Sequence, residues 1–261
     1  MGMKIVILCG GLGTRLREET EYRPKPMVEI GGKPILWHIM KNYAHFGFEE
    51  FILCLGYKGR IIKDFFYNYE VVNNDFTVEL GSDNKIEIHR KHDELGWRIT
   101  LAETGEKAMT GSRVSKVARY IDSDDFMLTY GDGLADIDLQ ELERFHASHG
   151  KIGTVTGVIP PSRFGSLDIE GRQVTRFSEK PRIEDDFVSG GFFIFKREFL
   201  DYLSDEDDCI LEKGPLDRLA ADGELVAFLH EGFWQCMDTY RDYQFLNEMW
   251  NSQNYPWKMW D

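Results

Sequence analysis

The sequence has no long apolar segment and little cysteine. No apolar run approaches the roughly 20 residues that a membrane-spanning helix needs. Residues 1–11 hold only about five consecutive apolar positions before their glycines, too few for the apolar region of a secretory signal peptide. The cysteines, Cys9, Cys54, Cys209 and Cys236, lie far apart and form no C-x-x-C pair. We therefore expect a cytoplasmic protein with reduced thiols and no contact with a membrane.

Positive charge is also scarce. The chain carries 31 Lys and Arg against 45 Asp and Glu, which gives a net charge of −14. This balance argues against broad binding of nucleic acids or anionic membranes, because both require a basic face. It also repels phosphate-rich substrates, so a phosphate site has to be built locally from a few cations and backbone N–H groups.

Apolar residues are plentiful enough for a full core. They make up 42% of the 261 residues, and aromatic residues make up 13%. No linker, internal repeat or low-complexity tract interrupts the chain, and the acidic run 204–208 is typical of a solvated loop. We therefore predict a single domain over residues 1–261.

Short apolar runs that end near glycine alternate with segments of helical spacing. Buried strands are predicted at Ile5–Leu8, Phe51–Leu55, Phe126–Tyr130, Thr154–Ile159, Gly190–Phe195 and Leu225–Leu229. Helices are predicted at Ile35–Phe46, Ile61–Tyr69, Gly111–Ile121, from the N-cap Asp138 to His149, and at Thr239–Trp250. This alternation is typical of βαβ units. It predicts an α/β fold with a mixed, mostly parallel central sheet flanked by helices, and a smaller β-rich insertion within Val71–Ala102.

The segment Leu8–Leu16, L-C-G-G-L-G-T-R-L, follows the first predicted strand. Its glycines let the backbone approach a phosphate chain closely, and Arg15 supplies a planar cation for phosphate oxygens. It is neither a Walker loop, which needs G-x-x-x-x-G-K-[ST], nor a dinucleotide fingerprint, which needs Gly or Ala where Leu16 stands. A tight turn without a ligand is the alternative, and the glycines alone do not decide between the two.

Lys25 stands between Pro24 and Pro26. The two prolines restrict the backbone on both sides, which predicts a lysine presented from a stiff, extended segment. An ammonium held in this way suits the stabilisation of charge on a phosphate in a transition state. The alternative is a proline-rich surface loop with an incidental lysine.

Two aspartates are candidate metal ligands. Asp132 lies between glycines at the end of a predicted strand, the edge where open α/β sheets bind ligands, and its carboxylate suits Mg²⁺. Asp238 follows the apolar segment 232–237 and is a candidate second ligand, or the N-cap of the last predicted helix, two compatible roles. Asp136 is a weaker candidate.

Other polar groups give weaker signals. In the segment 178–181, Lys180 is a candidate for binding a sugar phosphate and Glu179 for sugar hydroxyls, although E-K-P also fits an ordinary surface loop. His146 and His149 have a spacing that zinc sites use, but no third ligand is near in sequence, which disfavours zinc. No G-x-S-x-G nucleophile motif is present.

Taken together, residues 10–16 (G-G-L-G-T-R-L) and 25–36 (K-P-M-V-E-I-G-G-K-P-I-L) resemble the sugar nucleotidyltransferase family. The likeness is greatest to the branch that acts on CTP and glucose 1-phosphate. It covers essentially the whole chain through the further segments 17–20, 56–59, 109–113, 129–133, 163–169, 190–193 and 232–239.

The resemblance implies a Rossmann-like nucleotidyltransferase fold, Mg²⁺ as cofactor, and the conversion of CTP and α-D-glucose 1-phosphate into CDP-glucose and pyrophosphate. It also implies a homo-oligomer, a hexamer, that serves dideoxysugar synthesis for the bacterial O-antigen of lipopolysaccharide.

The resemblance further implies roles for individual residues. Lys25 and Arg15 would be catalytic, Asp132 and Asp238 would hold Mg²⁺, and Glu179 and Lys180 would face the sugar phosphate. The nucleotide would contact Leu8, Cys9, Gly10, Gly11, Leu12, Gly13, Thr14, Arg15, Lys25, Thr110, Arg113 and Gly131, with Arg113 acting in its own or a neighbouring subunit.

Two positions depart from the family pattern. Cys9 replaces a usual alanine of similar bulk, and Ser189 replaces a usual asparagine, so the sugar is less firmly predicted than the reaction type. The alternatives are a thymine, uracil or guanine nucleotide, another hexose 1-phosphate, or a catalytically silent nucleotide-sensing or metal-independent binding protein. Retention of Arg15, Lys25 and both aspartates disfavours the silent forms.

Overall fold

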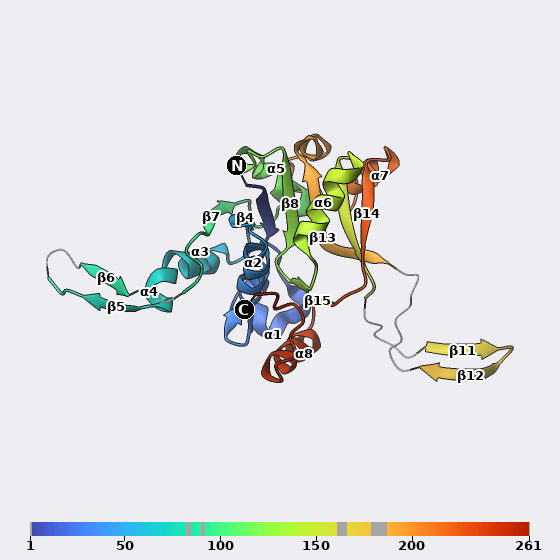
Figure 1. Cartoon of the computed structure of the whole chain (residues 1–261), viewed down its shortest axis with the longest axis horizontal. Coiled ribbons are helices and arrows are strands. Elements are labelled where there is room, and N and C mark those ends of the chain that lie inside the picture. The colour runs from blue at the N-terminus through green and yellow to red at the C-terminus, as the bar shows by residue number, and fades with distance from the viewer. Residues whose placement is uncertain (1, 82–84, 90–91, 161–165, 179–186, 261) are drawn as a thin grey trace.

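A seven-stranded sheet forms the centre of the molecule (Figure 1). The computed structural model describes residues 2–81, 85–89, 92–160, 166–178 and 187–260. Its central sheet has the order β14-β10-β13-β8-β1-β4-β7. These strands are β1 (Lys4–Leu8), β4 (Glu50–Leu55), β7 (Arg98–Glu103), β8 (Asp125–Tyr130), β10 (Gly153–Val158), β13 (Val188–Lys196) and β14 (Leu225–His230).

Six of these strands run in one direction. β13 alone is antiparallel, to β10 on one side and to β8 on the other, while the remaining neighbours pair in parallel. Every residue of β1 is buried, as expected for a continuous apolar strand covered on both faces. The predicted mixed, mostly parallel sheet is confirmed.

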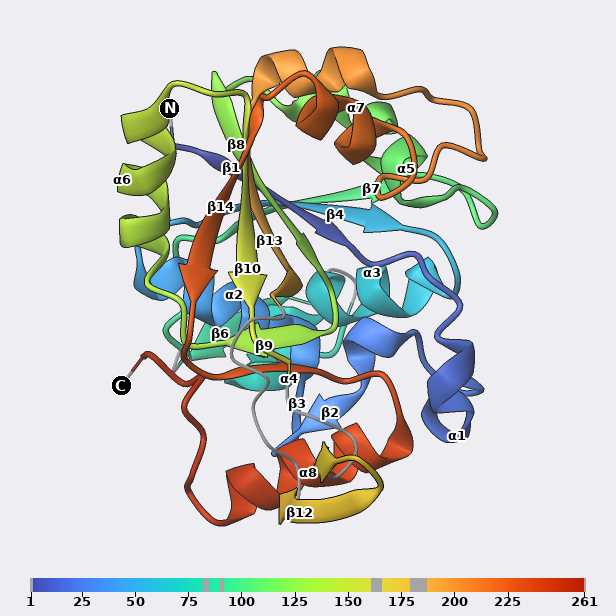
Figure 2. The ribbon, with the colours of Figure 1, turned by 90° about the vertical axis from the view of Figure 1, so that its right-hand side faces the viewer.

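Helices cover both faces of the sheet (Figure 2). One face packs against α2 (Ile35–His45), α3 (Gly59–Tyr67) and α6 (Leu139–His149). α8 (Tyr240–Asn251) lies beyond the sheet and contacts β2 (Glu29–Ile30). The opposite face packs against α5 (Thr110–Lys116) and α7 (Pro215–Ala221). Two short helices, α1 (Arg17–Thr20) and α4 (Tyr69–Asn73), complete the set together with 3-10 turns at Thr14–Leu16, Lys25–Met27, Ala118–Tyr120 and Arg197–Tyr202.

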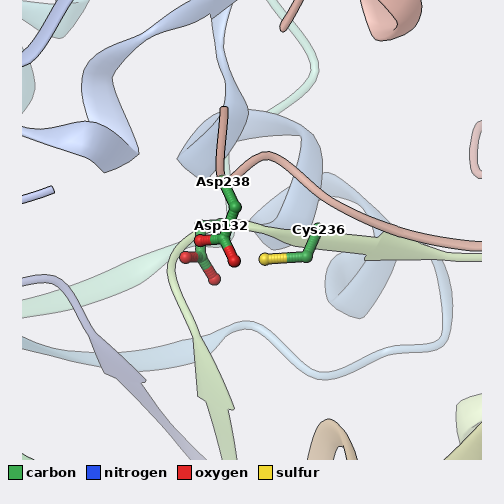
Figure 3. A group of neighbouring side chains, drawn as sticks. All are labelled: Asp132, Cys236 and Asp238. Atoms are coloured by element: carbon green, nitrogen blue, oxygen red, sulfur yellow. The ribbon is translucent and has the colours of Figure 1, made fainter. Parts of the chain in front are cut away.

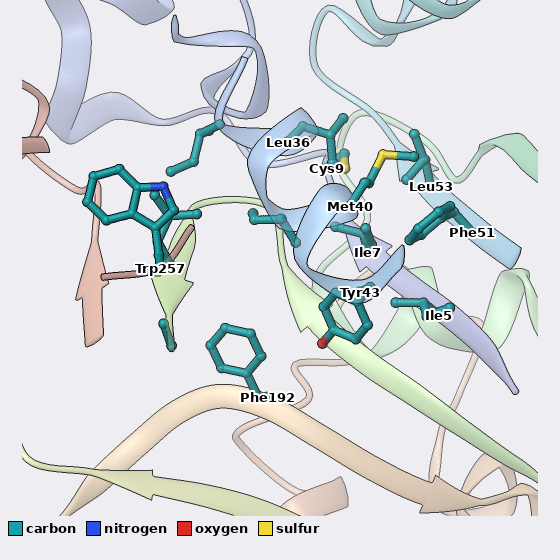
Figure 4. Packing of buried hydrophobic residues seen from close by; sticks show 14 of the residues in the cluster. Ile5, Ile7, Cys9, Leu36, Met40, Tyr43, Phe51, Leu53, Phe192 and Trp257 are labelled. Atoms are coloured by element: carbon teal, nitrogen blue, oxygen red, sulfur yellow. The ribbon is translucent and has the colours of Figure 1, made fainter. Parts of the chain in front are cut away.

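The larger core lies between α2 and the sheet (Figure 4). Met40 and Tyr43 of α2 pack with Ile5 and Ile7 of β1 and Phe51 of β4, and each of these side chains is at most 1% exposed. The odd-numbered residues of β1 face this core and the even-numbered ones face the core beneath α5 and α7. This rigid layer fixes where β1 ends and the glycine-rich segment begins.

Two predicted helices differ from the structure. The segment 61–69 belongs to α3, which starts earlier at Gly59 and ends at Tyr67, and a break at Asn68 separates it from α4. The segment 111–121 holds α5 only as far as Lys116. Beyond that residue the backbone N–H groups bond to carbonyls three residues back, which makes a 3-10 turn.

The predicted β-rich insertion is smaller than expected. β5 (Asp75–Val78) and β6 (Ile86–His89) form a hairpin that projects from the body (Figure 1), but Val71 lies in α4 and β7 joins the central sheet. Hydrophobic alternation had placed all three strand-like pieces together, because it does not reveal pairing partners. A second hairpin, β11 (Ser166–Glu170) with β12 (Gln173–Ser178), projects on the other side.

The last helix is clamped to a small hairpin that follows Lys25. This hairpin consists of β2 (Glu29–Ile30) and β3 (Lys33–Pro34). The Asn247 side chain of α8 accepts from the Gly31 backbone N–H (3.1 Å) and donates to the Glu29 carbonyl (3.2 Å). A Cβ on Gly31 would come within 1.9 Å of the Trp250 indole, and its φ is +59°, so glycine is required there.

Membrane-spanning helices were sought among the described residues, and none of the helices there combines the necessary length with the necessary hydrophobicity.

Candidate active site

A cavity of about 680 Å³ opens at the carboxyl ends of β1 and β8. Its walls are the glycine-rich segment and the chain that leads into α5. The residues that line it are 8–15, 25–26, 106–110, 113 and 130–132. All residues predicted to contact the nucleotide therefore surround one space, at the edge of the sheet where α/β proteins bind ligands.

Close backbone approach explains two of the glycines. Gly131 donates its N–H to the Leu8 carbonyl at 3.1 Å, and a Cβ on Gly131 would lie 2.9 Å from the Pro26 ring. Gly13 has a φ of +63°, and a Cβ there would meet the Thr20 methyl group at 2.7 Å. Gly131 thus lets the end of β8 contact the end of β1, and Gly13 lets the glycine-rich segment pack against Thr20.

Lys25 reaches two aspartates that lie far apart in the sequence. Its Nζ lies 2.6 Å from Asp132 Oδ2 and 2.5 Å from Asp238 Oδ1. The expected extended segment is corrected: Pro24 is extended, but residues 25–27 form a 3-10 turn because the Met27 and Val28 N–H groups bond back to residues 24 and 25. Pro26 is buried beside it, so the lysine is nevertheless fixed at its base.

A short strand pair brings the two aspartates together. β9 (Gly133–Ala135) pairs antiparallel with β15 (Trp234–Cys236), and Met237 N–H donates to the Asp132 carbonyl at 2.9 Å. The chain then enters α8 directly after Asp238. Two residues far apart in the sequence thus become neighbours through main-chain hydrogen bonds.

The N-cap of α8 is Thr239, and the predicted cap Asp238 lies one residue earlier. Thr239 accepts from the Asp242 N–H, and the Asp242 carboxylate accepts from the Thr239 N–H at 2.8 Å, which completes a capping box. The same carboxylate accepts from the Asp238 N–H at 3.1 Å. The helix start therefore holds the Asp238 backbone and leaves its side chain free to face Lys25.

Charges compensate one another in this cluster. Burial opposes ionisation of Lys25, but the Asp132 and Asp238 carboxylates outweigh it and raise the Lys25 pKa to about 12. Burial likewise acts to raise the Asp238 pKa, but Lys25 and Arg15 hold that pKa below its usual range. Arg15 Nη1 lies 2.7 Å from Asp238 Oδ2, and its side chain is 69% exposed at the cavity mouth. Two cations accordingly face the space from one side.

Cys236 joins the aspartates, which sequence reasoning missed (Figure 3). Single donor atoms of Asp132, Cys236 and Asp238 all lie within 4.8 Å of one another. Burial first, and then the Asp132 charge, raise the pKa of the Cys236 thiol well above its usual range. Two converging carboxylates fit a hard divalent cation, whereas a protonated thiol contributes little to it. Its place two residues before Asp238 was the only sequence signal.

Thr110 and Tyr130 meet a residue that the sequence did not single out, Glu212. The Thr110 hydroxyl donates to Glu212 Oε2 at 2.8 Å and accepts from the Leu211 N–H at 2.9 Å. The Tyr130 hydroxyl donates to the other Glu212 oxygen. Glu212 therefore fixes two residues of the cavity wall. No sequence motif around Glu212 predicts this arrangement.

Other candidates lie elsewhere. Asp136 is not part of the aspartate pair: its Oδ1 accepts from the Phe233 N–H at 2.7 Å and faces His230 Nε2 at 2.9 Å, so it fixes the turn before β15. His146 and His149 both contact the Thr154 hydroxyl, at 2.7 and 2.8 Å, as part of the packing behind β10. Within the described chain, neither histidine belongs to a group of three metal-binding side chains.

The sugar-phosphate candidates Glu179 and Lys180 lie outside the described residues. Ser189 lies in β13, where it pairs with Gly157 of β10 and is exposed.

Comparison with known proteins identifies the family. The family model described as nucleotidyl transferase matches residues 4–244. The chain belongs to the nucleotidyl transferase family. This nucleotidyl transferase is 50% identical over 260 residues to the glucose-1-phosphate cytidylyltransferase of Salmonella typhi, a match that covers 99% of this chain and 100% of the relative. It is 45% identical over 258 residues to the probable glucose-1-phosphate cytidylyltransferase of Bacillus subtilis, covering 99% and 100%.

Solved structures agree on the fold of this nucleotidyl transferase. HddC from Yersinia pseudotuberculosis matches with a TM-score of 0.68 and 26% identity, over 95% of this chain and 99% of that one. Apo UDP-glucose pyrophosphorylase matches with a TM-score of 0.70 over 97% and 99%, and its 17% identity makes this a likeness of fold alone. Nucleotidyl transferases generally use divalent metal ions. The predicted family and fold class are thereby confirmed.

Proposed function

We propose that the chain transfers the cytidylyl group of CTP to α-D-glucose 1-phosphate and releases CDP-glucose and pyrophosphate. The observation that carries this proposal is the 50% identity, over nearly the full length of both chains, to proteins named glucose-1-phosphate cytidylyltransferase. The cavity beside Lys25 and Arg15 supports it, because two fixed cations suit a pocket for a triphosphate in a chain of net charge −14.

In this proposal the reaction is a single in-line displacement. An anionic phosphate oxygen of the sugar phosphate attacks the α-phosphorus of CTP, and pyrophosphate departs. No general base is needed because the nucleophile is already ionised. The main obstacle is the repulsion between two polyanions, and correct placement of the reactants supplies about 7–11 kcal/mol.

Lys25 and Arg15 would act on charge rather than on protons. Lys25 remains protonated at neutral pH because its pKa is raised to about 12, so its ammonium is available to the α-phosphate. Arg15 offers a planar pair of donors to the outer phosphates from the exposed cavity mouth. The glycine-rich segment and Thr110, Arg113 and Gly131 would contact or shape the site of the nucleotide.

The carboxylates of Asp132 and Asp238 would hold the divalent ion, which we propose is Mg²⁺. When bound, Mg²⁺ neutralises charge on the reacting phosphate oxygens. Oxygen atoms of the two carboxylates lie within 4.8 Å of each other, as ligands of one cation require, and their backbones are fixed by β9, β15 and the start of α8. Glu179 and Lys180 are proposed to face the sugar phosphate.

We further propose that residues 1–261 form one domain. The chain is proposed to act in the cytoplasm, in the synthesis of O-antigen precursors. It is also proposed to assemble as a homo-oligomer, a hexamer. The β5–β6 hairpin supports the assembly. Phe76 pairs with Ile88 and Val78 with Ile86, so their side chains share one face of the hairpin, and Phe76, Val78 and Ile86 are exposed. An isolated two-stranded hairpin is marginally stable in water, and a second subunit would cover this face.

A triphosphate panel tests the proposed reaction. CTP, dTTP, UTP and GTP are each offered with glucose 1-phosphate, with and without Mg²⁺, and pyrophosphate release is measured. GTP belongs in the panel because the chain is also 32% identical to a probable mannose-1-phosphate guanylyltransferase of Oryza sativa. We expect CTP to be preferred and release to require the ion. Preference for another triphosphate, or unchanged release in excess chelator, would refute the proposal.

A further inference from the structure

Arg113 of α5 is buried beneath the glycine-rich segment, with only 4% of its surface exposed. Its Nη1 donates to the Leu55 carbonyl (3.0 Å), the Thr104 hydroxyl (2.7 Å) and the Gly105 carbonyl (2.8 Å). Its Nη2 donates to the Gly10 carbonyl at 3.0 Å. Within the described chain, no carboxylate lies within ion-pair distance of this guanidinium. Its charge is balanced by the main-chain carbonyl dipoles of Leu55, Gly105 and Gly10.

These acceptors lie at the carboxyl ends of three adjacent parallel strands. Gly10 follows β1, Leu55 ends β4, and Gly105 follows β7. The chain after β1 forms one wall of the cavity and the chain after β7 forms the other, at residues 106–110. The guanidinium therefore connects the two walls from below.

Two glycines leave room for this connection. A Cβ on Gly10 would lie 2.1 Å from Arg113 Nη1, and a Cβ on Gly56 would lie 2.5 Å from the same atom. A Cβ on Gly11 would meet nothing within 4 Å. Gly10, in the middle of the glycine-rich segment, is thus required by the arginine side chain. Gly56, outside the cavity lining, is required by that side chain and by the Gly10 carbonyl oxygen, which a Cβ on Gly56 would approach to 2.8 Å.

We propose that Arg113 is a positioning residue that sets the separation of the two walls of the nucleotide pocket through the carbonyls of Gly10 and Gly105. The inference rests on the proposed function for the nature of the ligand. The planar guanidinium directs several N–H donors at fixed angles and so can span β1 and β7 at once. A lysine ammonium at the same place is a point charge on a shorter group and bonds to one side or the other.

The first test is Arg113→Lys, with Arg144→Lys on the exposed face of α6 as the matched control. The equilibrium dissociation constant for CTP is measured by calorimetry, and kcat and KM by pyrophosphate release. Loss of charge-assisted hydrogen bonds predicts binding about tenfold to hundredfold weaker. Because the reacting groups are untouched, kcat at saturating CTP should stay within about threefold while KM rises. An unchanged dissociation constant, or a loss confined to kcat, overturns the proposal.

The second test uses Gly56→Ala, which changes no residue of the cavity lining. It should reproduce the weaker CTP binding of Arg113→Lys by displacing the same guanidinium and the Gly10 carbonyl that it binds, whereas Gly81→Ala, where a Cβ meets open space, should not. In the Arg113→Lys variant, Gly56→Ala should weaken CTP binding by a smaller factor than it does in the native protein. Full additivity, with circular dichroism confirming folded variants, overturns the proposal.

Failure of the proposed function is a distinct result. If the native protein prefers another triphosphate, the same variants are measured with that triphosphate, and weaker binding still supports the role of Arg113. If the native protein binds CTP and the variants bind it equally well, the positioning role alone is rejected.

Discussion

Lys25 is the residue that we propose acts on the α-phosphate. It is held between two carboxylates, so its removal leaves two like charges close together. Lys25→Met keeps the length of the side chain but removes its charge. We expect kcat to fall by about 10²-fold or more, in line with the loss of a transition-state donor, while the fold persists.

Pyrophosphate release measures the effect, and Lys213→Met at an exposed position is the control. Turnover near that of the native protein would remove Lys25 from the mechanism.

Individual residues also show what local sequence does and does not reveal. The fixed backbone at Lys25 was predictable, because the prolines on both sides restrict it. Glu212 and Cys236 were not, because their roles arise from contacts with residues far away in the chain. Arg113 was predicted from resemblance as a nucleotide-binding residue, but its hydrogen bonds to main-chain carbonyls depend on where β1, β4 and β7 end relative to one another.

Helix α8 matters because its first turn holds Asp238. Thr239→Ala removes the N-cap hydroxyl, which should cost about 1 kcal/mol of stability. Because Asp242 then loses one partner in the capping box, we also expect Asp238 to be held less firmly and divalent-ion binding to weaken.

A matched control is Asp138→Ala, which removes the N-cap of α6 away from the site. Urea unfolding should report similar losses for both variants, and calorimetric titration with Mg²⁺ should report weaker binding for Thr239→Ala alone. Equal Mg²⁺ affinities in the two variants would show that the N-cap of α8 does not affect the ion site.

At the level of elements, the central strands were the most predictable. β1, β4 and β8 are mostly apolar runs, since both faces of a parallel sheet are covered, and each is followed within two residues by glycine. β9 and β15 were missed as a pair because each is only three residues long and their pairing is set by tertiary contact. That pairing, rather than any motif, places Asp132 beside Asp238.

The whole molecule carries an exposed apolar face on the β5–β6 hairpin. Phe76→Asp places a charge on this face without altering the backbone pairing. If the face lies between subunits, the mass measured by light scattering after size exclusion should fall below that of the native assembly. Thr77→Asp, on the opposite face of the same strand, should leave the mass unchanged. Equal masses for both variants would place the interface elsewhere.

Stability of the whole molecule should depend on pH through His38. Its Nε2 donates to the Ile30 carbonyl at 2.9 Å, while Nδ1 is buried without a partner among Trp37, Trp250 and Trp260. Burial lowers the His38 pKa to about 4 from 6.5. The unfolded chain binds the proton more tightly, so the stabilisation is complete above about pH 6.5 and is lost as the pH falls towards 4.

Proton linkage at His38 predicts that the free energy of unfolding falls by about 2 kcal/mol between pH 7 and pH 5. Urea unfolding at both pH values measures it. His38→Gln keeps an N–H donor but does not titrate, so the loss between the two pH values should be smaller by about that amount. The same change at exposed His45 controls for the substitution itself, and an unaltered loss in His38→Gln would contradict the prediction.

The clamp between α8 and the β2–β3 hairpin has a consequence for the time at which the site first exists. A nascent chain on the ribosome carries the glycine-rich segment, Lys25 and Asp132 long before translation reaches Asp238 and Asn247. Until then the Asp238 carboxylate is missing, and the β2–β3 hairpin next to Lys25 lacks its hydrogen bonds to Asn247. If Asp238 is the metal ligand that we propose, the enzyme gains activity only after α8, near the end of its synthesis, has been made.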